Sequence, residues 1–114
     1  FSCEIKYAII INNMIIQLVT RTFINQKEAT AFENFFCIKW KDLIKEIPNC
    51  KLRLIRNKNN LNTFNALWEF PDSKTQNRVM KLIKIHNKNF KGSIAKKTVN
   101  FSGEVIKEYF FEKS

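Results

Sequence analysis

The fold of this chain is decided by residues 50–78, which read CKLRLIRNKNNLNTFNALWEFPDSKTQNR. Apolar and basic residues alternate over 50–54, as they do in a half-buried strand, and the polar segment 57–62 predicts a turn. Bulky apolar residues then alternate with other residues over 64–70, which predicts a second strand with one strongly apolar face. The stretch therefore predicts two antiparallel strands joined by a turn.

A helix is predicted to follow this second strand directly. Pro71 closes the strand, and either Asp72 or Ser73 is a good N-cap for a helix that reaches about His86. The residues expected to face the sheet recur at helical spacing and are Val79, Leu82, Ile83 and His86.

The residues before the deciding stretch predict one more strand and one more helix. Over 14–24 apolar side chains point to both faces, so we expect this strand to be covered on two sides. Asn25 and Glu28 form a capping-box pattern, and Pro48 ends a helix that we expect to reach Ile47. The apolar stripe of this helix is Ala29, Phe32, Phe36, Trp40, Leu43, Ile44 and Ile47.

The two ends of the chain predict further extended structure. Residues 87–97 form a basic, polar loop, and the alternation over 99–111 predicts a last strand with Gly103 as a bulge. Residues 1–13 are predicted to be an N-terminal extension that adds an edge strand, with a turn or bend at 12–13.

The order of elements from residue 14 to residue 114 is strand, helix, strand, strand, helix, strand. This order predicts a single α+β domain with a ferredoxin-like βαββαβ fold, in which an antiparallel sheet carries both helices on one face. The length of 114 residues fits one domain. The other face of the sheet would expose too many apolar residues to water, so we expect a homodimer or docking onto a partner.

Composition limits the classes of function. A net charge of +10 predicts attraction to nucleic acid, anionic lipid or acidic protein. Cys3, Cys37 and Cys50 form no C-x-x-C pair, which predicts buried thiols in a reducing compartment and neither a disulfide framework nor a zinc site.

The apolar run 7–19 is too short for a transmembrane span. The start at Phe1 resembles the end left by removal of a mitochondrial targeting sequence, although an artificial truncation explains it equally well.

Several segments resemble the dimeric α/β-barrel superfamily, in particular its antibiotic-biosynthesis-monooxygenase-like and NIPSNAP-type domains. The matching segments are the opening strand MIIQLVTRTFI, the helix start NQKEATAFENFF, the helix-to-strand junction IPNCKLRLIRN and the strand end LWEFPDS. The resemblance covers roughly residues 14–88. It implies the fold that the order of elements already predicts. It also implies a pocket between the sheet and the helices.

The resemblance also implies which residues would line that pocket. In the haem-degrading branch an Asn on the first strand, a Trp at the end of the third and a His on the second helix do so. In this sequence the Trp corresponds to Trp68, and the position of the Asn is occupied by Arg21. The sole His, His86, lies nearly two helical turns beyond the position of the His in that branch. Arg21, Trp68 and His86 are therefore the pocket candidates, with no catalytic residue, metal or cofactor predicted. A packing role is nevertheless the favoured explanation of both Trp68 and His86.

The strongest functional signal is a set of basic residues with no acidic residue among them. No Asp or Glu lies between Asp72 and Glu104, whereas a solvated helix face usually carries both signs. This pattern favours contact with phosphates or an acidic surface, and no RNP-type motif indicates recognition of specific bases. We call this set the basic face: Lys74, Arg78, Lys81, Lys84, Lys88, Lys91, Lys96 and Lys97.

Charge and resemblance together predict a non-catalytic structural or accessory subunit of a large assembly. A mitochondrial respiratory-chain complex or the mitochondrial ribosome fits, on the matrix side, with RNA, cardiolipin or an acidic subunit opposite the basic face. The first alternative is a homodimeric, cofactor-independent monooxygenase or haem-binding enzyme of the same superfamily. The second alternative is a simple RNA-binding module.

Overall fold

The computed structural model describes residues 5–10, 14–47 and 49–113. Its elements are β1 (Ile5–Ile10), β2 (Ile15–Thr22), α1 (Gln26–Leu43), a 3₁₀ turn (Ile44–Glu46), β3 (Lys51–Ile55), β4 (Thr63–Phe70), α2 (Ser73–Asn87), β5 (Lys97–Glu104) and β6 (Glu108–Lys113).

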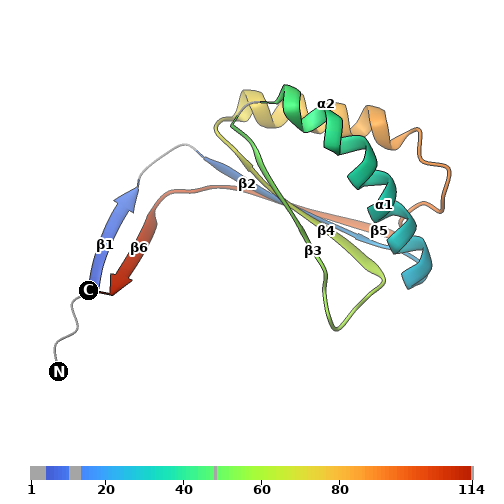
Figure 1. Cartoon of the computed structure of the whole chain (residues 1–114), viewed down its shortest axis with the longest axis horizontal. Helices are drawn as coiled ribbons and strands as arrows, with labels where there is room; N and C mark the ends of the chain where they lie inside the picture. Colours follow the sequence, from blue (N-terminus) through green and yellow to red (C-terminus); the bar gives the residue numbers. More distant parts are fainter. Residues whose placement is uncertain (1–4, 11–13, 48, 114) are drawn as a thin grey trace.

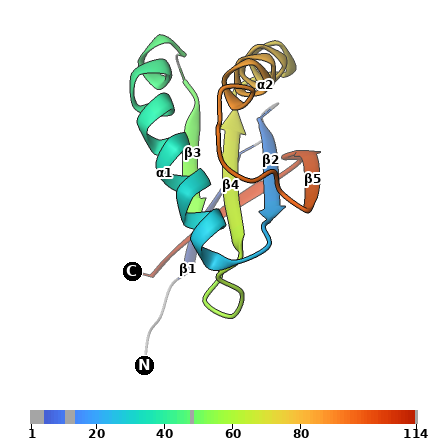
Figure 2. The ribbon, with the colours of Figure 1, turned by 90° about the vertical axis from the view of Figure 1, so that its right-hand side faces the viewer.

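The body of the molecule is a four-stranded antiparallel sheet in the order β3-β4-β2-β5, which can be followed from left to right in Figure 2. Both helices lie on the same side of this sheet (Figure 1). The predicted ferredoxin-like βαββαβ arrangement is confirmed. Because β2 lies between β4 and β5, its residues are neighbours of residues from two other parts of the chain.

The helix ends follow the predicted capping residues. The backbone amide of Glu28 donates to Asn25 Oδ1 at 2.9 Å, whereas the Glu28 carboxylate accepts from the backbone amide of Ser93 at 3.4 Å. The predicted end of the first helix at Ile47 is wrong, since α1 ends at Leu43 and a 3₁₀ turn follows it. Asp72 is the N-cap of α2 and accepts from the backbone amide of Thr75 at 2.7 Å.

The Asp72 cap predicts a pH dependence of stability. The hydrogen bond from the backbone of Thr75 holds the pKa of Asp72 below its ordinary value. A carboxylate with a lowered folded-state pKa stabilises the fold above its unfolded-state pKa, and this contribution is lost as the pH falls through the folded-state pKa. We expect Asp72→Ala to lower the urea midpoint at neutral pH, and the difference from the unaltered protein to shrink in acid. Asp72→Asn, which caps without titrating, is the control; a difference that does not vary with pH would contradict the assignment.

The core lies between the helices and the sheet and is mostly aromatic. Trp68 and Phe70 on β4 are fully buried and stack with ring centroids 5.5 Å apart. Trp40 on α1 meets Trp68 edge to face at 5.4 Å. The alternation predicted for β4 is confirmed, since its buried side chains are Phe64, Ala66, Trp68 and Phe70.

The two chain ends form a separate two-stranded antiparallel sheet, which we call the arm. The predicted N-terminal edge strand does form, but β1 pairs with β6 and not with the four-stranded sheet. The single last strand that we predicted is wrong, because residues 105–107 divide it into β5 and β6. Gly103 makes no bulge, since it pairs with Ile16 in an unbroken register. The turn predicted at 12–13 lies outside the described residues.

The arm projects from the body (Figure 1). The radius of gyration is 17.1 Å, whereas about 13 Å is expected for a compact domain of this length. The exposed fractions of Tyr109, Phe110 and Phe111 on β6 are 48%, 63% and 65%. The arm therefore presents large apolar side chains to solvent.

The face of the sheet opposite the helices is uncovered and has an apolar centre; we call it the open face. In the strand register Leu18 lies between Leu67 on β4 and Phe101 on β5. Phe101 is 62% exposed and the nearby Val99 is 48% exposed. A Thr20 to Asn65 hydrogen bond of 2.9 Å and a Lys51–Glu69 ion pair of 3.5 Å flank this centre.

Candidate functional site

A pocket of about 590 Å³ opens on the helix side of the sheet, between β2 and α2. That volume lies within the range of small-molecule sites in proteins. One wall is apolar and the other is basic and polar. Its lining residues are Gln17, Val19, Arg21, Phe36, Trp68, Met80, Ile83, Lys84, Asn87, Lys88 and Asn100.

Arg21 is the least exposed of the three charged residues that line this pocket. It is half-buried on β2, and this burial lowers the pKa of its guanidinium because water is removed from the charged form. Its Cζ atom lies 5.3 Å from the ring centroid of Phe32, a cation–π contact. Among the described residues Arg21 forms no ion pair; the two pairs formed are Lys51–Glu69 and Arg56–Glu33.

A hydrogen-bonded network of amides contributes Gln17 and Asn100 to the pocket lining. Gln17 is buried, its Nε2 donates to Asn100 Oδ1 at 3.2 Å, and its Oε1 accepts from Gln76 Nε2 at 2.9 Å. Gln76 also contacts Ser102 Oγ at 2.9 Å. These residues were not predicted from the sequence, although a glutamine within the apolar strand 14–24 was a signal that could have identified Gln17.

Among the residues of the pocket lining, two enclosed polar atoms lack a hydrogen-bond partner in the described part of the chain. They are the indole Nε1 of Trp68 and the side-chain Oδ1 of Asn87. Buried polar groups in native proteins are usually hydrogen-bonded, so each such atom requires an explanation.

The structure brings two of the three predicted pocket residues together. Arg21 and Trp68 both line the pocket, whereas His86 is absent from its lining. The His86 ring lies on the other side of α2, where its centroid is 6.3 Å from that of Trp40. The positions of α2 that reach the pocket are instead Met80, Ile83, Lys84 and Asn87, followed by Lys88.

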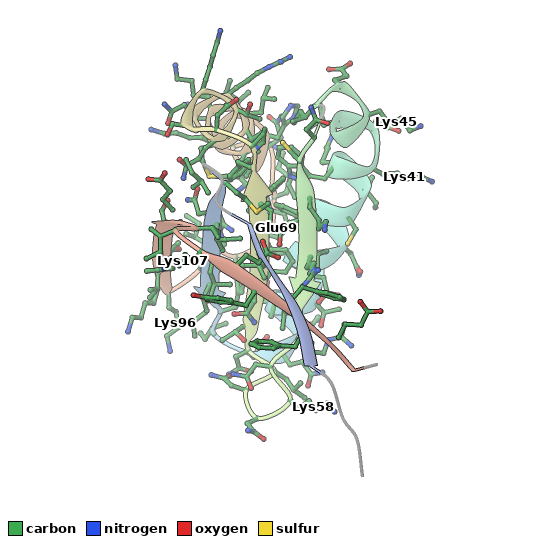
Figure 3. The ribbon with its side chains drawn as sticks, turned by 90° about the vertical axis from the view of Figure 1, so that its left-hand side faces the viewer. Lys41, Lys45, Lys58, Glu69, Lys96 and Lys107 are labelled. Atoms are coloured by element: carbon green, nitrogen blue, oxygen red, sulfur yellow. The ribbon has the colours of Figure 1, made fainter. Side chains whose placement is uncertain are left out.

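Every member of the basic face is exposed to solvent. Lys84 and Lys88 also stand at the mouth of the pocket, so the basic face and the pocket share an edge. Basic residues are not confined to α2. Figure 3 shows Lys41 on α1, Lys45 in the 3₁₀ turn that follows it, Lys58 in the β3–β4 loop and Lys107 beyond β5, placed around the periphery with Glu69 nearer the centre.

Other expected features can be placed within the described part of the chain. No group of three His, Cys, Asp or Glu side chains there could hold a metal ion. None of its helices has the length and apolar character needed to cross a membrane. Cys37, which we expected to be buried, is exposed, and Cys50 is half-buried; Cys3 lies outside the described residues. Partial desolvation raises the pKa of Cys37, and Glu33 adds to that effect.

No protein-family model and no curated protein matches the sequence. Solved structures do match. A dimeric ferredoxin-like protein from an uncultured marine organism is 14% identical, with a TM-score of 0.72, over 85% of this chain and 91% of that chain. A Caulobacter crescentus protein provisionally assigned as an antibiotic biosynthesis monooxygenase is 16% identical, with a TM-score of 0.65, over 84% of this chain and 92% of that chain.

A second dimeric ferredoxin-like protein from an uncultured marine organism is 15% identical, with a TM-score of 0.58, over 85% of this chain and 99% of that chain. The fold is thus that of the dimeric ferredoxin-like and antibiotic-biosynthesis-monooxygenase-like proteins. The predicted resemblance to this superfamily is confirmed at the level of the fold.

Proposed function

We propose that this protein is a non-catalytic docking subunit. It associates with a second copy of itself through the open face and meets an acidic or phosphate-bearing partner through the basic face. The observation that carries the proposal is the apolar centre of the open face, with Leu18 between Leu67 and Phe101 and with 62% of Phe101 exposed.

A second copy is the occupant of the open face that the observations favour. Two of the similar structures are described as dimeric proteins of the same fold. The centre of the open face is apolar while its edge strand β3 carries Lys51 and Arg53, an arrangement of apolar core and polar rim that is typical of protein interfaces. A side of the sheet with this composition is expected to be buried in the working protein.

The basic face supports the second half of the proposal. All of its side chains are exposed, and no acidic residue lies among them in the sequence. A uniform positive surface attracts RNA phosphates, anionic lipid head groups or an acidic protein, and the attraction weakens as salt is added. The arm adds a further, apolar surface, and since two-stranded sheets are marginally stable alone, we expect the arm to pack on a neighbouring subunit.

Membership of a large assembly can be tested by sedimentation of the native protein in a lysate of its source. We expect it to travel with a megadalton particle and to stay there through a high-salt wash. Loss of the particle on nuclease treatment would identify a ribosome, and resistance to nuclease would favour a respiratory-chain complex. A protein that sediments as a free small dimer would contradict the assembly role. The mitochondrial matrix location stays a prediction, to be checked by imaging a tagged protein.

The pocket favours one alternative, an enzyme of the same superfamily. Its volume of about 590 Å³ and its position beside Trp68 suit a small substrate, and one protein with this fold is provisionally assigned as a monooxygenase. Oxygen consumption with a quinol-like substrate, or a Soret shift on haem titration, would support this alternative. Retention of the function of the parent assembly in Trp68→Phe and His86→Gln would oppose it.

A further inference from the structure

The pocket holds a positive charge without a counter-ion. Arg21 is half-buried, and among the described residues no acidic side chain pairs with it. A desolvated charge is costly unless an opposite charge or hydrogen bonds offset it, and the Phe32 ring at 5.3 Å offsets only a small part. Arg21 also lines a smaller neighbouring hollow of about 170 Å³, so space adjoins it on two sides.

The charges around Arg21 add to its field. Lys84 and Lys88 line the same pocket, so three cationic groups and no carboxylate face it. A guanidinium presents donors in a planar fork that matches carboxylate and phosphate oxygens. The electrostatics of the pocket therefore favour an oxyanion.

The apolar wall of the pocket indicates what kind of group the ligand carries besides its anionic group. Val19, Phe36, Trp68 and Ile83 supply an apolar surface with two aromatic rings. The unpartnered Nε1 of Trp68 is a donor, and the unpartnered Oδ1 of Asn87 is an acceptor. Both atoms are enclosed by protein, so it is the apolar surface of this wall that indicates a ligand with a flat apolar body.

We propose that the pocket binds a small amphipathic oxyanion, a carboxylate or phosphate monoester, with its anionic group on Arg21 and its apolar body against Trp68. This site is complete within one chain and does not rest on the docking role proposed above. It gives the basic face a second use, because Lys84 and Lys88 guide the anion to the mouth of the pocket.

The test compares two probes that differ only in charge, 2-naphthoate and neutral 2-naphthamide. We expect naphthoate to bind the full chain at least about tenfold more tightly by calorimetry, because only the carboxylate pairs with Arg21. In NMR spectra the indole Nε1–H signal of Trp68, assigned with Trp68→Phe, should shift on binding. Phenyl phosphate in place of naphthoate tells whether the anionic site prefers carboxylate or phosphate. Equal affinity for the two naphthalene probes would overturn the proposal.

Variants locate the binding to the pocket. Arg21→Met should abolish the preference for naphthoate over naphthamide, while Arg53→Met, which removes a charge from β3, should leave it unchanged. Without ligand Arg21→Met should melt no lower than the unaltered protein, because it removes an unpaired desolvated charge. A large drop in melting temperature would assign Arg21 a structural role instead. Should that variant fail to fold, the exposed double change Lys84→Gln with Lys88→Gln is expected to weaken naphthoate binding severalfold, and an unchanged affinity would count against the proposal.

Ligand binding in the pocket can be tested independently of dimerisation through the open face. A variant that is monomeric through a change on the open face, such as Leu18→Lys, keeps the pocket intact and should bind naphthoate as before. Loss of binding on monomerisation would overturn a site contained within one chain.

Discussion

Trp68→Ala is expected to lower the free energy of unfolding by about 3–5 kcal/mol, the usual range for removing a fully buried Trp or Phe side chain. Trp68 contacts Trp40 edge to face and stacks on Phe70, with ring centroids 5.4 Å and 5.5 Å away. Its loss leaves a cavity that these rings, on α1 and β4, cannot refill without moving the helix. Since domains of this size are stable by about 5–15 kcal/mol, the variant is expected to be partly unfolded at physiological temperature.

Equilibrium unfolding in urea measures this effect. Ile38→Ala is the matched control, because Ile38 is 70% exposed on α1 and its truncation is expected to change stability by less than about 0.5 kcal/mol. Trp68→Phe should fall between the two, since it keeps much of the ring volume and also removes the unpartnered Nε1. A cost of less than about 1 kcal/mol for Trp68→Ala would mean that the core is not organised around this side chain.

The elements of the body could be predicted because their signals are local. The alternation over 64–70 and the caps at Asn25 and Asp72 each involve residues close in sequence, and the structure confirms them. The arm could not be predicted in this way, because strand periodicity identifies a strand and not its partner. The pairing of Ile5 with Lys113 joins opposite ends of the chain.

Only part of the candidate site could be predicted from the sequence, and the reason is geometric. The superfamily pattern predicted Arg21 and Trp68, which line the pocket, but it also predicted His86, which lies toward Trp40. Adjacent positions on a helix differ by about 100° around its axis, so a shift of one residue, from His86 to Asn87, changes the face. The amide network of Gln17 spans three elements, and sequence spacing alone does not bring those elements together.

Leu18→Lys is expected to dissociate the proposed dimer, raising its dissociation constant by about 100-fold or more. Leu18 lies at the centre of the open face, and a lysine there would bury an unpaired charge against the same charge of the symmetric copy. The fold of the single chain should survive, because this face is already open to solvent in the monomer.

Sedimentation equilibrium over a concentration series measures this change. Ile24→Lys is the matched control: Ile24 is 65% exposed and lies beyond the end of β2, so the same added charge should leave the dimer intact. A wild-type protein that is monomeric at all concentrations would contradict the homodimer itself. A Leu18→Lys protein that keeps the wild-type dissociation constant would instead place the interface elsewhere, and the exposed aromatic side chains of the arm, Tyr109, Phe110 and Phe111, would then be the surface to alter next.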